Sequence, residues 1–153
     1  MRTLKLALAL VLTPALMSAL ALPAEAATLV HHNSPENLAL GYPFSEAVQV
    51  GDTLYLAGQL GHKPGSSELV PGGVGPQTVQ TLKYIQQTLE AYGSDLQHVA
   101  KCTIFLADIN DWPAVNTVYR QFFSAPYPAR SALAASGLAL GAAVEIECIA
   151  VVK

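Results

Sequence analysis

The chain has 153 residues, of which 8 are Lys or Arg and 11 are Asp or Glu, so its formal net charge is −3. A weakly acidic chain with scattered basic residues lacks the positive surface that binds phosphate backbones, which argues against a nucleic-acid partner. Apolar residues make up 52% of the chain and charged residues only 12%. This is more apolar surface than a small monomer buries, and it favours an oligomer.

The first 26 residues have the composition of a secretory signal peptide. Arg2 and Lys5 are the only charges before Glu25, Leu6–Leu12 is apolar, and Ala24-Glu25-Ala26 fits an A-x-A cleavage site. The apolar part is too short, and too often interrupted by Ala and Pro, to predict a membrane span. An uncleaved N-terminal anchor is the alternative interpretation.

Cleavage after Ala26 predicts a mature chain of residues 27–153, which is one domain in size. It carries 6 basic and 10 acidic residues, a formal charge of −4. We therefore expect a secreted, periplasmic protein with no membrane attachment after the signal peptide is removed.

The first part of this domain is predicted to be mostly extended. Thr28–His32 is a short candidate strand, and Ala47–Gln59 is a candidate hairpin with Gly51-Asp52 as its turn. Apolar residues alternate on both sides of that turn, at Val48, Val50, Leu54 and Leu56. Gly61–Gly75 is rich in Gly, Pro and Ser and is predicted to be a loop.

Two amphipathic helices follow, separated by a strand. The first is predicted to begin at Gly75-Pro76 and to end at Gly93. The strand is Val99–Leu106, and the second helix is predicted to begin at Asn110 or Asp111. The apolar stripes are Val79, Leu82, Ile85 and Leu89 in the first helix, and Val115, Val118, Tyr119 and Phe122 in the second.

The last two predicted strands are Ser131–Ala135 and Val144–Val152. The order strands, helix, strand, helix, strands predicts an α/β fold in which two helices cover one face of a mixed sheet. By alternation the other face is partly polar, which suggests packing against another subunit with water or ligand between. That face carries Lys101, Thr103, Phe105, Glu145, Glu147, Ile149 and Val151.

Cys102 and Cys148 are the only cysteines, and each lies within a predicted strand. Export would allow a disulfide between them. Disulfide geometry is strict, however, and buried free thiols are the commoner outcome at such positions. We therefore expect two free thiols, with a disulfide as the alternative.

Arg130 stands at the head of a small, mostly apolar run. Its guanidinium is permanently charged, so it either points to water or binds a carboxylate. Glu145 and Glu147 share one face of their strand. An Arg and a carboxylate on neighbouring strands can form a structural ion pair, or a site that clamps an anion and positions water. The pattern alone leaves both possibilities open.

The chain resembles the RidA/YjgF family of reactive-intermediate (enamine/imine) deaminases. The resemblance covers nearly all of residues 27–153. It is carried by LYLAGQLG at 54–61, by the VN.VY..FF pattern ending at 123, by YPARSALAA at 127–135 and by VEIECIAVV at 144–152. The P-A-R-S and V-E-I-E motifs together make the match specific.

The resemblance implies a chorismate-mutase-like fold of the bacillus type. It also implies a homotrimer in which three sheets form a central barrel, with the helices outside and ligand clefts between subunits. The implied reaction is hydrolysis of 2-imino acids, or their enamine tautomers, to 2-keto acids and ammonia, as in 2-iminobutanoate/2-iminopropanoate deaminases. No metal and no organic cofactor are implied.

By motif, Arg130 corresponds to the arginine that binds the substrate carboxylate, and Glu145 to the glutamate that positions the attacking water. Gly58 and Asn116 correspond to residues that line the cleft. Phe44 and Ala132 occupy further substrate-binding positions.

This sequence departs from the family pattern at three positions that carry polar side chains in the family. Ala57 replaces a serine, Ala132 a cysteine and Phe44 a tyrosine, and each lost hydrogen bond costs on the order of 1 kcal/mol. A non-catalytic trimer that binds a small carboxylate, such as an imino or keto acid, is therefore the alternative to a deaminase. A chaperone-like role for the apolar trimer surface is a third possibility.

Overall fold

Seven strands form one mixed sheet in the computed structural model, which describes residues 28–153. The predicted signal peptide and its cleavage site after Ala26 lie outside the described residues. The strands are β1 (Leu29–His32), β2 (Ala47–Val50), β3 (Thr53–Leu56), β4 (Gln59–Leu60), β5 (Val99–Leu106), β6 (Ala129–Ala134) and β7 (Val144–Val151). The helices are α1 (Pro35–Leu40), α2 (Val74–Ala91) and α3 (Trp112–Phe122).

The strand order is β1-β2-β3-β7-β5-β6, and β4 pairs with the remaining part of β7. β5 and β6 pair in parallel, whereas the other described pairs are antiparallel. α3 lies within the connection between β5 and β6, and parallel neighbours need such a crossover. The predicted α/β class and mixed sheet are confirmed.

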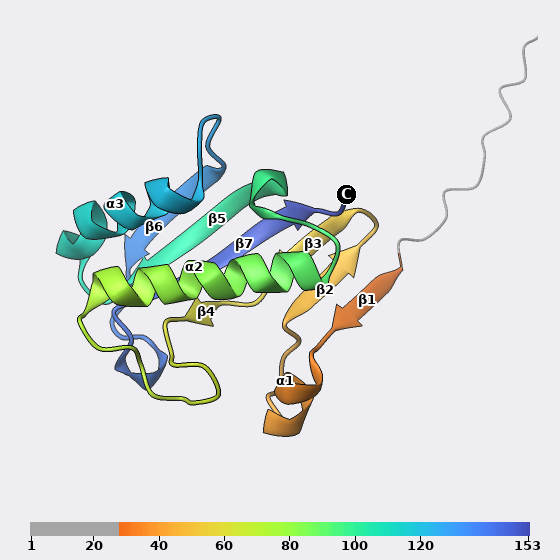
Figure 1. Cartoon of the computed structure of the whole chain (residues 1–153), viewed down its shortest axis with the longest axis horizontal. Coiled ribbons are helices and arrows are strands. Elements are labelled where there is room, and N and C mark those ends of the chain that lie inside the picture. The colour runs from red at the N-terminus through yellow and green to blue at the C-terminus, as the bar shows by residue number, and fades with distance from the viewer. Residues whose placement is uncertain (1–27) are drawn as a thin grey trace, which may run out of the picture.

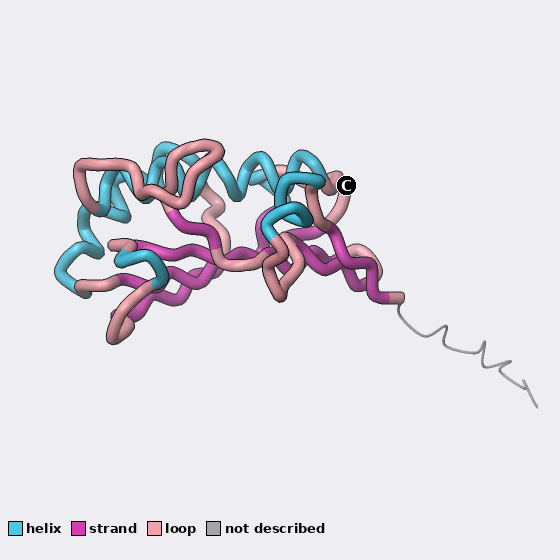
Figure 2. Tube along the Cα trace, turned by 90° about the horizontal axis from the view of Figure 1, so that it is seen from below, coloured by secondary structure: helices cyan, strands magenta, loops and turns pink. Residues whose placement is uncertain are grey.

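Helices α2 and α3 lie on the same face of the sheet (Figures 1 and 2). The core lies between them and the strands, as the apolar stripes predict. Leu82, Ile85 and Leu89 of α2 are completely buried, and they pack with Ile104 of β5 and Ile146 of β7 in one cluster. No helix within residues 28–153 combines the length and the apolar character that a membrane span requires.

The opposite face of the sheet is uncovered in one chain. Cross-strand pairs place Thr103 opposite Glu147 and Phe105 opposite Glu145 on this face, as the alternation predicts. The apolar residues Tyr55, Leu133 and Val151 are 46%, 44% and 42% exposed, although the solvated face of a sheet normally carries polar side chains.

The predicted hairpin is confirmed, with Gly51 at φ 57° in the turn between β2 and β3. Helix α2 begins at Val74, two residues before Pro76, because Gly73 at φ 79° provides the bend that precedes it. Pro76 is tolerated there because the N–H groups of the first turn have no partner within the helix. The predicted stop is confirmed by Gly93, which has φ 80° two residues after the last residue of α2.

The second helix begins next to one of its two predicted caps. Asp111 occupies the N-cap position of α3, and Pro113 lies in the first turn. A short 3-10 turn at Ile109–Asp111 precedes the helix, and the Asp108 carboxylate accepts a hydrogen bond from the Asn110 N–H. Strand β6 begins at Ala129, two residues before the predicted start, so Arg130 is part of the strand.

One short helix is absent from the sequence prediction. The Ser34 hydroxyl of α1 accepts a hydrogen bond from the Asn37 N–H, and Gly41 at φ 65° ends the helix. Ser-Pro followed by Glu is a recognisable N-terminal pattern, but α1 has only six residues and buries none of them. The apolar period that identifies longer helices is therefore missing.

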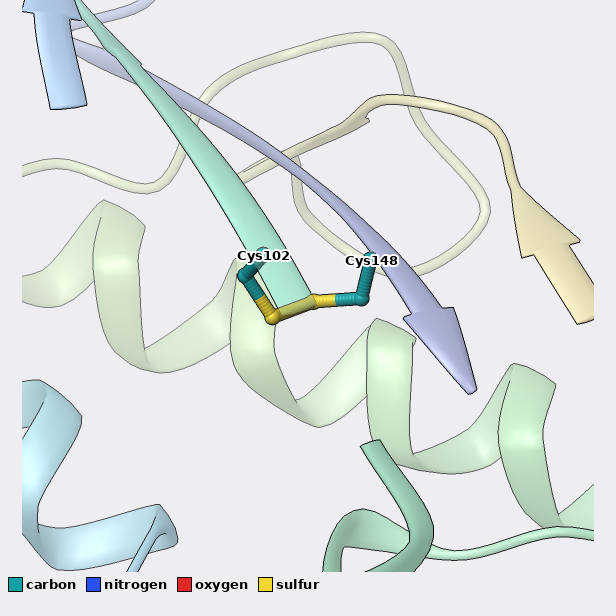
Figure 3. Close-up of a disulfide and its surroundings, with 2 residues drawn as sticks. All are labelled: Cys102 and Cys148. Carbon is teal, nitrogen blue, oxygen red and sulfur yellow. A yellow bond between two sulfur atoms is a disulfide. The ribbon is translucent and has the colours of Figure 1, made fainter. Parts of the chain in front are cut away.

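The expectation of two free thiols is wrong, because Cys102 and Cys148 form a disulfide (Figure 3). The register places them directly opposite each other on β5 and β7, with Cα atoms 4.1 Å apart. That separation is typical of the close pairs in an antiparallel ladder. The two residues are 0% and 1% exposed, on the face covered by α2.

Candidate functional site

Arg130 lies on the helix-covered face of the sheet, near its edge. It pairs in register with Cys102, whose side chain belongs to the core, so the two side chains share a face. The guanidinium carbon Cζ lies 4.9 Å from the ring centroid of Tyr119 and 5.9 Å from that of Trp112. Within residues 28–153, Arg130 has no carboxylate at ion-pair distance.

Helix α3 faces Arg130 with one row of side chains. Trp112, Asn116 and Tyr119 follow the i, i+4, i+7 spacing, so the predicted cleft residue Asn116 lies between the two aromatic residues that contact Arg130. Ala132 lies two residues along β6 on the same face as Arg130, opposite Ile104. We call these five residues, Arg130, Ala132, Trp112, Asn116 and Tyr119, the arginine group.

Glu145 lies on the uncovered face, where β7 pairs with β4 and β5. It is opposite Phe105 on one side and Leu60 on the other. Gly58 sits directly against it, since a Cβ at Gly58 would overlap the carboxylate and lie 3.0 Å from Cδ of Glu145. Burial, and to a lesser extent the charge of Glu147, raises the pKa of Glu145 above the usual value for a glutamate.

Phe44 belongs to the loop between α1 and β2. It is 53% exposed and stacks on Tyr42, with ring centroids 5.1 Å apart. The loop is tied to the next segment because the Ala57 N–H donates a 2.9 Å hydrogen bond to the carbonyl of Glu46. We call Glu145 and Gly58, together with Phe44 from the loop that this bond joins to Ala57, the glutamate group.

The Glu46 carboxylate anchors this loop. It accepts hydrogen bonds from the N–H and the hydroxyl of Ser34, at 2.6 and 3.0 Å, and from the Tyr92 hydroxyl, at 2.6 Å. These bonds fasten the start of α1 and the end of α2 to the residue that precedes β2. The backbone that carries Phe44 is thus held from two sides, although the Phe44 ring itself is free to contact another molecule.

One chain does not bring the two groups together. Arg130 and Glu145 point to opposite faces of the sheet, because their register partners Cys102 and Phe105 do. They are also two strands and three residue positions apart, which corresponds to a Cα separation of about 14 Å at ordinary strand spacing. A single substrate cannot span that distance through the sheet.

The remaining features of residues 28–153 do not offer an alternative centre. No group of three or more His, Cys, Asp or Glu side chains in this range is arranged to hold a metal ion. A surface hollow of about 650 Å³ lies between the ends of α2 and α3, and its lining includes none of the residues of either group. Its acidic residues already have partners, since Asp95 pairs with His98 and Lys153, and Glu90 accepts a hydrogen bond from Gln86.

Sequence reasoning placed Arg130, Glu145, Gly58, Asn116, Phe44 and Ala132 at the site, and the structure divides them between the two groups. It did not include Tyr119, which was assigned to the apolar stripe, or Trp112. The sequence pattern that could have identified them is the i, i+4, i+7 spacing of Trp112, Asn116 and Tyr119. Aromatic residues at helical spacing are far more often core residues, so that signal was weak.

Comparisons with known proteins place these motifs in a family. The family described as Endoribonuclease L-PSP matches residues 35–152. The 2-iminobutanoate/2-iminopropanoate deaminase of Capra hircus is 50% identical over 109 residues, which cover 71% of this chain and 80% of that protein. The human protein of the same name is 44% identical over 109 residues, with the same shares covered.

Solved structures give the same assignment. The crystal structure of RidA from the Antarctic bacterium Psychrobacter sp. PAMC 21119 has a TM-score of 0.70 and 39% identity, and the match covers 72% of this chain and 89% of that one. The crystal structure of the yeast protein YEO7 has a TM-score of 0.73 and 34% identity, with 82% and 100% covered. The chain therefore belongs to the Endoribonuclease L-PSP family, which is the RidA/YjgF family.

Proposed function

We propose that this protein hydrolyses 2-imino acids to 2-keto acids and ammonia, in sites that form between the subunits of a homotrimer. The observation that carries the proposal is the pair of charged groups, Arg130 without an ion-pair partner and Glu145 with a raised pKa. Perturbed, unpartnered groups of this kind are typical of functional sites. The names of the relatives at 44–50% identity support the same reaction.

In this mechanism Arg130 binds the substrate carboxylate through two parallel N–H···O bonds. Glu145 accepts a proton from a water molecule as the water oxygen bonds to the imine carbon, and the electron pair of the C=N bond moves to nitrogen, which takes up a proton. The resulting carbinolamine then loses ammonia as its C–N bond breaks and the C=O bond forms. A glutamate with a raised pKa is a stronger base than an ordinary one, which suits it to this step.

The separation of the two groups supports an inter-subunit site. Arg130 lies near the edge of the sheet, and Glu145 lies on a face that one chain leaves open. In a ring of three identical chains, the edge of one sheet can meet the open face of the next by the same heterologous contact each time. Each site then takes Arg130 from one subunit and Glu145 from its neighbour, together with the exposed Phe44.

Mixed oligomers test this arrangement directly. Arg130→Ala and Glu145→Gln subunits are inactive alone, but co-refolded in equal amounts they place an intact Arg130 opposite an intact Glu145 in about a quarter of the sites. We expect hydrolysis of 2-iminobutanoate at about a quarter of the wild-type rate per site in the mixture. If each site lay within one chain, the mixture would stay as inactive as its components.

A carboxylate-binding protein without catalysis is the second candidate. It is favoured by Ala57, Ala132 and Phe44, which leave Arg130 and Glu145 as the main polar groups of the site. Wild-type protein that binds 2-oxobutanoate in a calorimeter, loses this binding as Arg130→Ala, and leaves 2-iminobutanoate to decay at its buffer rate would support the binder. We do not propose RNA as a ligand of the deaminase or of the binding protein, because the chain has a net charge of −3.

We also propose that the protein is exported. The signal-peptide composition of residues 1–26 supports this, and so does the buried disulfide, since disulfides persist in oxidising compartments. Expression of the full chain with a C-terminal epitope, followed by cell fractionation and mass measurement, tests it. Recovery of a chain that starts at Ala27 from the periplasm is expected, and an intact chain in the cytoplasm would contradict the proposal.

A further inference from the structure

Arg130 is held by aromatic rings. Its Cζ atom lies 4.9 Å from the centroid of Tyr119 and 5.9 Å from that of Trp112, both within the range of cation–π attraction. Both rings come from α3, seven residues apart on the face that meets β6. One rigid helix thus provides both contacts to the guanidinium.

These contacts leave the hydrogen-bonding capacity of Arg130 unused. A guanidinium has five N–H donors in its plane, and attraction to a ring face consumes none of them. Within residues 28–153, Arg130 has neither an ion pair nor a side-chain hydrogen bond. A carboxylate neighbour would hold the guanidinium equally well but would compete with an incoming anion for the same donors.

Tyr119 acts through its ring and not through its hydroxyl. The residue is 4% exposed, and its hydroxyl oxygen is buried without a hydrogen-bond partner in the described part of the chain. Burial raises the pKa of Tyr119 to about 12, so the phenol stays neutral at working pH. The ring also stacks on Phe123, with centroids 4.3 Å apart, which fixes its position against Arg130.

Building on the proposed role of Arg130 as the carboxylate binder, we propose that Tyr119 and Trp112 are positioning residues. They hold the guanidinium against α3 so that its donors stay directed at the substrate carboxylate. Loss of a partly buried cation–π contact corresponds to about a tenfold change in an equilibrium constant. Because the carboxylate contact is made equally in the ground state and the transition state, we expect this change in KM and not in kcat.

The test combines a spectroscopic signature with kinetics. The Nε–Hε resonance of Arg130, assigned by its loss in Arg130→Lys, is expected to be shifted upfield by the ring currents of Tyr119 and Trp112. Tyr119→Leu and Trp112→Leu should move it toward the random-coil position and raise the KM for 2-iminobutanoate about tenfold. Tyr119→Phe keeps the ring and should preserve both the resonance position and KM.

Phe122→Leu is the matched control, because Phe122 lies on the same helix and packs against the core, but its ring is not one of the two that hold Arg130. It should leave both readouts unchanged. An Arg130 resonance that stays at its wild-type position in Tyr119→Leu and Trp112→Leu would overturn the proposal, as would equal KM changes in Tyr119→Leu and Phe122→Leu. The resonance needs no substrate, so wild-type protein without hydrolytic activity would contradict only the proposed function.

Discussion

The disulfide should be the largest single contribution to stability that substitution can remove. Cys102 and Cys148 are separated by 46 positions in sequence, and the bond closes that loop in the unfolded chain. The chain-entropy relation for a loop of this length gives about 4 kcal/mol at room temperature. Replacing both residues by alanine also removes two buried sulfur atoms, and the resulting cavity adds to the loss.

We expect the free energy of unfolding of Cys102→Ala/Cys148→Ala to fall by at least about 4 kcal/mol in urea titrations. The slope of the transition should increase, because the unfolded chain without the cross-link exposes more surface. Protomer concentration must be equal in all titrations, since oligomer formation also stabilises the folded state. Reduced wild-type protein is the control, and it should lose the cross-link contribution without the added cost of the cavity.

A double variant within about 1 kcal/mol of the wild type would refute the reasoning, because the relation leaves no room for so small a loss. The reasoning would also be refuted if reduction destabilised the wild type but alanine substitution did not. In that case the cost would come from burying two free thiols and not from the loss of the cross-link.

Four further predictions concern packing and charge. Thr81→Val should raise the free energy of unfolding by about 1 kcal/mol in thermal or urea titrations, because the Thr81 hydroxyl is buried without a partner. Gly61→Ala should lower it by about 1–3 kcal/mol, because the added Cβ would lie 2.5 Å from Cα and the carbonyl oxygen of Gln77. In pH profiles of kcat/KM, the acid limb should lie above the usual glutamate pKa, and Glu147→Gln should move it to lower pH by removing a like charge. Since the raised pKa of Glu145 means that the folded state binds this proton more tightly, stability should rise as pH falls from the raised pKa to the ordinary one, and Glu145→Gln should abolish that part of the pH dependence. An unchanged acid limb in Glu147→Gln, or no gain in Thr81→Val, would contradict these assignments.

Most of the fold could be predicted from local patterns. The stripes in α2 and α3, the Gly51-Asp52 turn and the alternation in β5 and β7 each identify an element from neighbouring residues alone. The errors are at boundaries, where Gly73 and not Gly75 precedes α2, and in α1, which is too short and too exposed to show a period. The ends of helices and the formation of very short helices are the features that local sequence patterns define least well.

The disulfide and the arrangement of the site could not be predicted in the same way. Both depend on register, which no local pattern contains. Knowing that Cys102 lies in a strand does not show which residue of β7 is opposite it. Similarly, the motifs identify Arg130 and Glu145, but only the pairing of β6, β5 and β7 shows that one chain keeps them on opposite faces.

Gly58 has a consequence for how this site can evolve. A Cβ at this position would overlap the Glu145 carboxylate, so any larger residue must displace that carboxylate. Libraries that randomise position 58 should therefore return glycine almost without exception wherever activity is selected. Substrate preference can then change through other positions of the site, such as Ala57, Ala132 and Phe44, and not through position 58.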